Sequence, residues 1–218
     1  MRTTEPARPS NVVSADTQTQ SGRQRSGVAQ DRALELHQQN LANDSAATFG
    51  QFRAGEALVQ LGRYAEALPH LRRAMELGNQ DFVTDSLSLF QRLSRAMIQS
   101  GMCKALAKLT RPDAATACAR TARFVDATPV EPTHAFPRAH FAGLWLEIGE
   151  AYEALAQQAR LAETERDAHH LAARDSYRKS LDIWQDLTTR KLISPIDTTR
   201  FRVAALAVER TNGALGKP

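Results

Sequence analysis

The stretch GEALVQLGRYAEALPHLRRAMEL, which runs from Gly55 to Leu77, decides the fold of this chain. Its apolar residues recur at three and four positions on both sides of Gly62, and that spacing is typical of an α-helix. The pattern starts in a new phase after Gly62, as expected at a tight turn that needs a positive φ. The sequence therefore predicts two antiparallel helices that meet at Gly62.

The composition favours an all-α fold. Of the residues, 42% are hydrophobic but only 6% are aromatic, so alanine and leucine, which are strong helix formers, supply most of the apolar content. The 28 lysines and arginines outnumber the 24 acidic residues, and the resulting net charge of +4 is spread along the chain. Such a mild positive charge is a weak indication of an acidic partner.

The N-terminal region differs from the rest of the chain. Its first 28 residues hold too few apolar side chains to build an apolar face, so we predict that 1–28 is a disordered tail. An organelle transit peptide is the alternative for a leader rich in arginine. Because no apolar stretch approaches the roughly 20 residues that span a bilayer, we expect no membrane association.

Cys103 and Cys118 are the only cysteines, and they lie fifteen positions apart. This spacing is typical neither of a metal site nor of a disulfide framework. We expect both to pack as small hydrophobic side chains where two helices meet. Unpaired cysteines are typical of a reducing compartment, so we predict a cytoplasmic location.

Further helices follow beyond Gly78. Apolar periodicity predicts one that reaches Leu109, and another with Pro112 in its first turn. The segment DATPVEPTHAFPRAH carries three prolines and is predicted to be a linker. Two longer helical stretches come next, and the last helix is expected to begin with Ser194 as N-cap and Pro195 as its first residue.

The helical pattern repeats. Laying the stretch from Glu56 over the stretch from Lys104 without gaps superposes alanine on alanine and leucine on leucine at several positions. A third copy begins at Trp145, as Trp, two residues, Ile148, Gly149, two residues, Tyr152. This pattern resembles the tetratricopeptide repeat.

The resemblance implies an α-solenoid of antiparallel helix pairs, with about three lengthened repeats near 45–79, 84–127 and 138–190. A capping helix at 195–214 would close a domain that spans 29–215, and a lone helix would precede the first repeat. The spacings between equivalent positions exceed the family's period of about 34 residues, so we expect longer hairpins. The small residues expected where helices cross closely are Gly55, Ala67, Ala74, Ala115, Ala122, Gly149 and Ala173, with Cys103 in place of a crossing glycine.

The stretch ARDSYRKSLDIWQDLTTRKLISPID, together with the lengthened hairpin before it, is similar to the C-terminal repeat region of bacterial serine/threonine kinases that carry tetratricopeptide arrays. The chain itself has no glycine-rich nucleotide loop, no His-Arg-Asp catalytic loop and no Asp-Phe-Gly. It also lacks a nucleophile elbow and other catalytic signatures, so we expect neither enzymatic activity nor a cofactor. We expect His70 and the pair His169–His170 to lie on exposed helix surfaces rather than to bind a metal.

In this resemblance the first helix of each repeat lines a concave face. The implied function is a non-catalytic protein–protein interaction module that binds a peptide or a partner protein there, without nucleic acid. One alternative is a detached recruitment tail of a bacterial kinase system, which could also self-associate; another is that the apolar members of this face are simply core. The residues carried over to the concave face are Phe49, Phe52, Glu56, Val59, Met97, Ser100, Lys104, Ala107, Leu146, Glu150 and Glu153.

Overall fold

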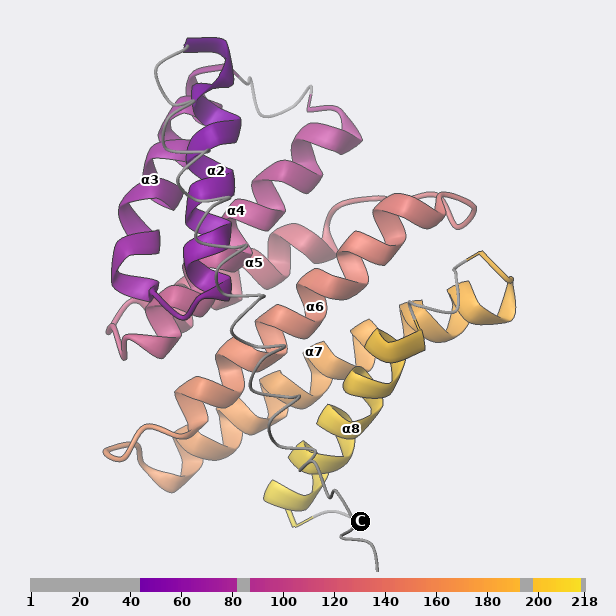
Figure 1. Ribbon diagram of the computed structural model, residues 1–218. Coiled ribbons are helices and arrows are strands. Elements are labelled where there is room, and N and C mark those ends of the chain that lie inside the picture. The colour runs from indigo at the N-terminus through magenta and orange to yellow at the C-terminus, as the bar shows by residue number, and fades with distance from the viewer. Residues whose placement is uncertain (1–43, 82–86, 193–197, 217–218) are drawn as a thin grey trace, which may run out of the picture.

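A computed structural model describes residues 44–81, 87–192 and 198–216, and these ranges contain helices and no strand, which confirms the all-α class. The predicted tail at 1–28 and the lone helix that follows it lie outside the described residues, as do Ser194 and Pro195. The helices are α2 (Asp44–Gln60), α3 (Tyr64–Asp81), α4 (Leu89–Lys108), α5 (Ala114–Asp126), α6 (Ala135–Ala156), α7 (Glu163–Thr189) and α8 (Thr198–Ala214) (Figure 1).

The reversal predicted at Gly62 is confirmed. Gly62 has a φ of 74° and lies between the end of α2 and the start of α3. Its N–H donates to the carbonyl of Val59 at 3.1 Å, and the N–H of Arg63 donates to the carbonyl of Leu58 at 2.8 Å. These bonds satisfy the last carbonyls of α2, as in the common glycine-terminated helix ends.

The turn after α4 repeats this geometry without a glycine. Thr110, which is 48 positions after Gly62, has a φ of 52°. Its N–H donates to Ala107 at 3.1 Å, and the N–H of Arg111 donates to Leu106 at 3.0 Å. Because a left-handed backbone brings Cβ of an L-residue close to the next carbonyl, Thr110 adopts this conformation at a cost of roughly 1 kcal/mol.

Two hairpins close over a glycine. A Cβ built on Gly55 of α2 would lie 2.7 Å from the side chain of Leu71 in α3. A Cβ on Gly149 of α6 would lie 2.4 Å from the ring of Tyr177 in α7. Leu71 and Tyr177 are completely buried, so neither has room to move away.

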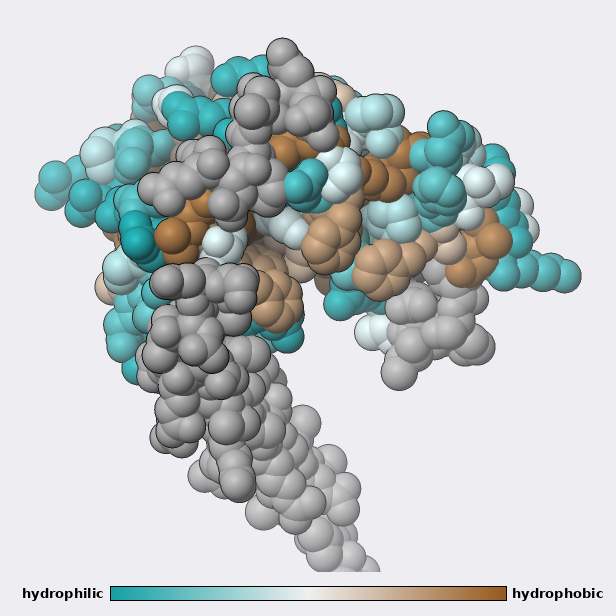
Figure 2. Space-filling view, turned by 90° about the horizontal axis from the view of Figure 1, so that it is seen from above, coloured by the Kyte–Doolittle hydropathy of each residue, from teal (hydrophilic) through white to brown (hydrophobic). Residues whose placement is uncertain are grey.

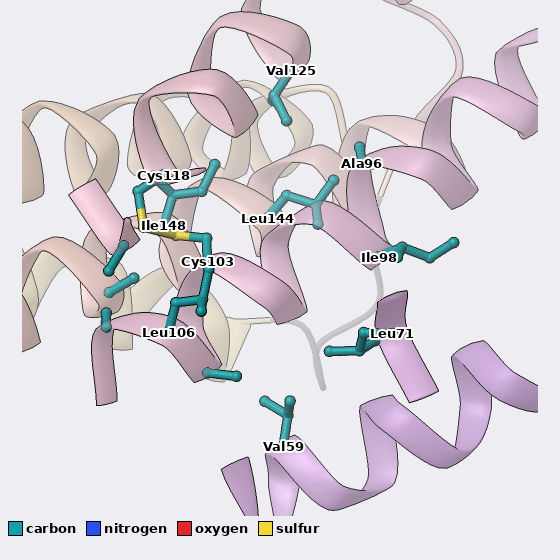
Figure 3. Close-up of a cluster of buried hydrophobic side chains, with 14 of the residues drawn as sticks. Val59, Leu71, Ala96, Ile98, Cys103, Leu106, Cys118, Val125, Leu144 and Ile148 are labelled. Carbon is teal, nitrogen blue, oxygen red and sulfur yellow. A yellow bond between two sulfur atoms is a disulfide. The ribbon is translucent and has the colours of Figure 1, made fainter. Parts of the chain in front are cut away.

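The hairpin of α4 and α5 closes over a disulfide, and our expectation of unpaired cysteines is wrong. Cys103 and Cys118 are bonded, with their Cα atoms 4.8 Å apart, and both are fully buried in the same cluster as Leu106 and Ile148 (Figure 3). The antiparallel packing of α4 and α5 brings residues fifteen positions apart face to face, which no spacing rule captures. The argument for a reducing compartment loses its basis, since disulfides persist mainly in oxidising ones.

In α5 the buried positions lie one residue earlier than the gapless sequence alignment predicts. Ala115 and Ala122, expected to be inward, are half-buried, whereas Ala114 and Thr121 are completely or almost completely buried. The first buried residue of α5, Ala114, lies four positions after Thr110, whereas Ala67 of α3 lies five positions after Gly62. Three residues separate Thr110 from α5, and one separates Gly62 from α3. The small positions in the other two second helices, Ala67, Ala74 and Ala173, are fully buried.

Two helix boundaries differ from those predicted. Pro112 precedes α5, which begins at Ala114, and does not lie in its first turn. The proline-rich linker ends at His134, because α6 begins at Ala135 with Pro137 in its first turn. A proline is tolerated there since the first N–H groups of a helix have no partner within it. The extra length expected in the third hairpin is confirmed by the 22 residues of α6 and the 27 of α7.

The hairpins pack against one another in chain order. The helices α2, α4 and α6, which come first in their hairpins, are neighbours, and α8 packs on α7 (Figure 1). One large apolar core extends from α2 to α8, and a smaller cluster around Trp184 and Leu187 lies at the α8 end. Within the described ranges, no helix is both long enough and apolar enough to cross a membrane.

Candidate functional site

The first helices of the three hairpins surround a pocket of about 240 Å³. Helices α2, α4 and α6 supply most of its wall, and α3 and α8 contribute one residue each. This set of residues will be called the α2–α4–α6 pocket. Its lining consists of Phe52, Arg53, Glu56, Val59, Gln60, Leu71, Met97, Gly101, Lys104, His140, Gly143, Leu144, Glu147 and Arg200.

The pocket brings together many of the residues expected on the concave face. Phe52, Glu56, Val59, Met97 and Lys104 line it, and Glu150 and Ser100 bind residues that do. Phe52 is 6% exposed and therefore belongs both to the core and to the wall of the pocket.

Other expected residues lie elsewhere. Phe49 is 59% exposed and does not line the pocket, and Leu146 packs against the core instead. Ala107 is buried. On α6 the position that enters the pocket is Glu147, next to the expected Leu146, because the phase assigned to this helix was one residue, or about 100°, off.

Lys104 joins α4 to α6 across the pocket. Its Nζ lies 2.6 Å from Oε2 of Glu150. Burial favours the neutral amine, but the charges of Glu150 and Glu147 outweigh that effect, and the net result is a raised pKa of Lys104. Lys104 therefore stays a cation and is committed to Glu150.

Glu147 is a half-buried charged group that lines the pocket. Oγ of Ser100, a fully buried side chain, donates to its Oε2 at 2.7 Å. Burial raises the pKa of Glu147, which the Ser100 hydrogen bond and the Lys104 charge lower only in part, while Glu150 and Glu56 raise it further. The hydrogen bond to Ser100 holds the carboxyl group against α4 at the pocket wall.

The rim of the pocket carries further charges. Arg53 pairs with Glu56 one turn along α2. Arg200 of α8 lies over Gly143 of α6, where its Nη1 would be 3.3 Å from an added Cβ. His140 lines the pocket on the same helix, one turn before Gly143. Sequence reasoning missed Arg200, since nothing local in α8 indicates which helix it will face.

Glu153 has a different task from the one expected. It accepts hydrogen bonds from the Tyr177 hydroxyl at 2.8 Å and from Nε and Nη2 of Arg210 at 2.6 and 2.7 Å. These bonds, led by that of Arg210, lower the pKa of Glu153, while burial and the Glu153 charge raise the pKa of Tyr177. The three side chains fasten α8 to α6 and α7, so Glu153 serves packing.

His70, His169 and His170 are half-buried, contrary to our expectation of exposed surfaces. Nδ1 of His70 lies 2.8 Å from Oε1 of Gln51, and burial lowers the pKa of His70. His169 stacks on Tyr152 with the ring centroids 6.2 Å apart, and burial lowers its pKa too. Among the described residues, no group of three or more His, Cys, Asp and Glu side chains is arranged to hold a metal ion.

A second hollow, of about 260 Å³, lies between α5, α6 and α7. Its main polar group is already engaged, because Nζ of Lys179 lies 4.3 Å from the ring centroid of Trp145 and 2.6 Å from Oδ1 of Asp126.

Exposed apolar surface does not point to another site. On the face shown in Figure 2, hydrophobic residues form separate patches among hydrophilic ones. Large exposed hydrophobic side chains are scattered over several helices, and single ones are normal on a folded protein. Within the described part of the chain, they are Phe49, Phe90, Phe136, Leu192, Val203 and Leu206.

No protein-family model matches this chain, and neither a curated protein nor a solved structure is significantly similar to it. The feature of the molecule that indicates a function is therefore the α2–α4–α6 pocket, with its geometry and its charges.

Proposed function

We propose that this chain is a non-catalytic protein–protein interaction module that binds a peptide, or an extended or helical segment of a partner protein, in the α2–α4–α6 pocket. The observation that carries the proposal is the composition of the pocket wall. Equivalent helices of three successive hairpins place apolar side chains, such as Met97 and Val59, beside charged ones, such as Lys104 and Glu147. Peptide-binding grooves combine these two kinds of group.

The size of the pocket supports a peptide over a cofactor. Sites for drug-sized ligands occupy roughly 300–1,000 Å³. The α2–α4–α6 pocket, at about 240 Å³, is smaller and suits one or two side chains of a longer ligand whose backbone runs over the surface.

The same proposal includes the finer fold. We interpret the three hairpins as lengthened tetratricopeptide-like repeats near 45–79, 84–127 and 138–190, in an α-solenoid closed by a cap at 195–214. The recurrence of one turn geometry at Gly62 and Thr110 supports a repeat, as does the packing of hairpins in chain order. The cytoplasmic location remains a prediction, and the disulfide counts against it.

A pull-down with matched surface variants tests the function. The bait is the full chain, and the pocket variant carries Gln60→Glu and Met97→Glu, which add two negative charges to the wall of the pocket. The control variant carries Thr116→Glu and Gln185→Glu, which add the same charge at exposed positions of α5 and α7 outside the pocket. Proteins bound from a lysate of the source organism are identified by mass spectrometry.

We expect a partner that binds the parent and the control variant but not the pocket variant. Circular dichroism must show equal helicity for the three baits. If every captured protein binds the pocket variant as well as the parent, the pocket is not the binding site and the proposal fails.

A further inference from the structure

Glu147 is a carboxylate that lacks a cationic partner of its own. Its one hydrogen bond comes from the neutral hydroxyl of Ser100, at 2.7 Å, and within the described part of the chain it forms no ion pair. Removing a charge from water without pairing it is costly, so a buried carboxylate normally has a cation beside it. The α2–α4–α6 pocket therefore contains a carboxylate whose charge is not matched by an ion-pair partner.

Two of the cations that line the pocket are engaged with other carboxylates. Nζ of Lys104 is bound to Glu150 at 2.6 Å, and Arg53 is bound to Glu56. Glu56 and Glu150 act on Glu147 as like charges, and each of these two is paired with a cation, whereas Glu147 forms no ion pair among the described residues.

A further cation, Arg200 of α8, also lines the pocket. Arg200 lies over Gly143, which is one helical turn before Glu147 on α6, and His140 lies one turn further back. An anionic group of a ligand would face Arg200, whereas a cationic group would face Glu147. Charge complementarity of this kind fixes both the orientation and the choice of a partner.

The walls around Glu147 suit a long side chain with a charged end. Leu144, Met97 and Val59 are apolar and line the same pocket. Lysine and arginine bury their aliphatic stems against apolar surface while the charged group reaches a polar one. An acidic side chain is too short to use these walls and would be repelled by Glu147.

We propose that Glu147 anchors a lysine or arginine side chain of the partner segment that enters the α2–α4–α6 pocket. This inference rests on the proposed function, since it names the chemistry of the ligand at that site. The ammonium or guanidinium group replaces the missing cation, and Ser100 holds the carboxylate in position from behind. An exposed basic residue flanked by apolar residues is the expected recognition element.

Phage display of random twelve-residue peptides on the full chain tests the inference. We expect enriched peptides to share one lysine or arginine next to apolar residues. A synthetic peptide of the enriched sequence is then titrated by fluorescence polarisation, together with a copy in which citrulline or glutamine replaces the basic residue. Citrulline keeps the shape of arginine without its charge, so this comparison needs no change to the protein.

The protein is varied in parallel. Glu147→Gln retains the size of the side chain and its capacity to accept from Ser100, and Glu131→Gln is the control at an exposed loop position. We expect Glu147→Gln to weaken binding of the basic peptide on the order of thirtyfold, as for other buried charge pairs, and to leave the neutral peptide almost unaffected. Glu131→Gln should change neither.

The possible outcomes distinguish a failure of the role proposed for Glu147 from a failure of the proposed binding function. Enriched peptides that lack a basic residue, or a basic peptide that loses no affinity with citrulline or with Glu147→Gln, overturn the role of Glu147. The proposed function survives that result if the same peptides fail to bind the variant with Gln60→Glu and Met97→Glu. If no peptide is enriched, or if none depends on the pocket, both proposals are overturned.

Discussion

The hairpins of α2–α3 and α4–α5 reach the same backbone geometry with different residues. Gly62 and Thr110 occupy equivalent turns with equivalent hydrogen bonds, although only glycine adopts a positive φ without strain. At the crossing of the two helices, Gly55 lies against Leu71 in the first hairpin, while Cys103 is bonded to Cys118 in the second. The same turn geometry thus occurs at Thr110, although the glycine that usually indicates such a turn is absent there.

The two hairpins also differ in the size of their second helix. Helix α3 has 18 residues, whereas α5 has 13 and can bury less apolar surface against its partner. A covalent bond restrains the shorter hairpin by limiting the freedom of the unfolded chain. The first hairpin depends on close packing over a glycine instead. We therefore expect the α4–α5 hairpin to be sensitive to loss of its disulfide, and the α2–α3 hairpin to be sensitive to a larger side chain at Gly55.

Removal of the disulfide should have the largest effect. The bond closes a loop with a sequence separation of 15, for which chain-entropy estimates give a stabilisation of about 3 kcal/mol. We expect the variant with Cys103→Ala and Cys118→Ala to lose about that amount in its free energy of unfolding, measured by urea denaturation.

Reduction of the wild-type chain should reproduce this loss, and a reductant should not affect the double variant. A thiol titration on the unfolded chain provides the control, because it should find no free thiol before reduction and two afterwards. Two titratable thiols in the untreated chain would contradict the disulfide.

Gly55→Ala should be the next largest change. The new Cβ would lie 2.7 Å from two atoms of Leu71, which is fully buried. Overpacking of this kind costs about 1–3 kcal/mol and outweighs the gain in helix propensity of up to about 1 kcal/mol. We expect a net loss of about 1–2 kcal/mol in urea denaturation.

The matched control is Gly213→Ala in α8, where an added Cβ meets no atom within 4 Å. That change should leave the stability unchanged or raise it slightly. Equal effects of the two substitutions would show that α2 and α3 do not cross closely at Gly55.

Exchange of the turn residues should give effects of opposite sign. Thr110→Gly relieves the left-handed strain and should raise the free energy of unfolding by about 1 kcal/mol, whereas Gly62→Thr should lower it by a similar amount. Thermal denaturation of the two variants measures both shifts. If Thr110→Gly destabilises the chain, the two turns are not equivalent.

Glu147→Gln should have the smallest effect, and it should depend on pH. Because the folded state raises the pKa of Glu147, the native chain binds more protons than the unfolded chain once the pH exceeds about 4.3. Its contribution to stability therefore falls as the pH rises from that value through the folded pKa, and then levels off. We expect the variant to melt at a higher temperature than the wild type at pH 7, with no difference at pH 4.

A variant that is less stable than the wild type at pH 7 would show that the carboxylate has a stabilising partner. In that case Glu147 would not be available to a ligand. Glu131→Gln, which removes the same charge at an exposed position, again serves as the control.

Much of the fold could be predicted because local patterns carry it. The phase change at Gly62 and the alanine-rich periodicity are properties of short segments, and both predict helices and their reversals correctly. The pairing of Cys103 with Cys118 depends on how two helices face each other, and the register of α5 depends on the path of the chain between Thr110 and Ala114. Neither property is written in a local pattern.

The residues of the pocket also divide into those that the sequence pattern could place and those that it could not. Phe52, Glu56, Met97 and Lys104 could be placed together because the predicted repeat relates α2 to α4 by a fixed interval. Glu147 was missed because α6 was assigned a phase one residue off, and a rotation of about 100° exchanges a wall residue for a core residue. Arg200 comes from a helix outside the repeat, so no interval in the sequence could place it.

Methionine methyl NMR tests the binding site most directly. Of the four methionines, Met97 lines the α2–α4–α6 pocket, Met75 and Met102 pack against the core outside that lining, and Met1 lies outside the described residues. Labelled full chain is titrated with the basic peptide from the display experiment, and Met97→Leu assigns the key signal. The account predicts that the Met97 methyl shifts on binding while those of Met75 and Met102 stay in place. An unchanged Met97 signal in the presence of bound peptide would contradict it.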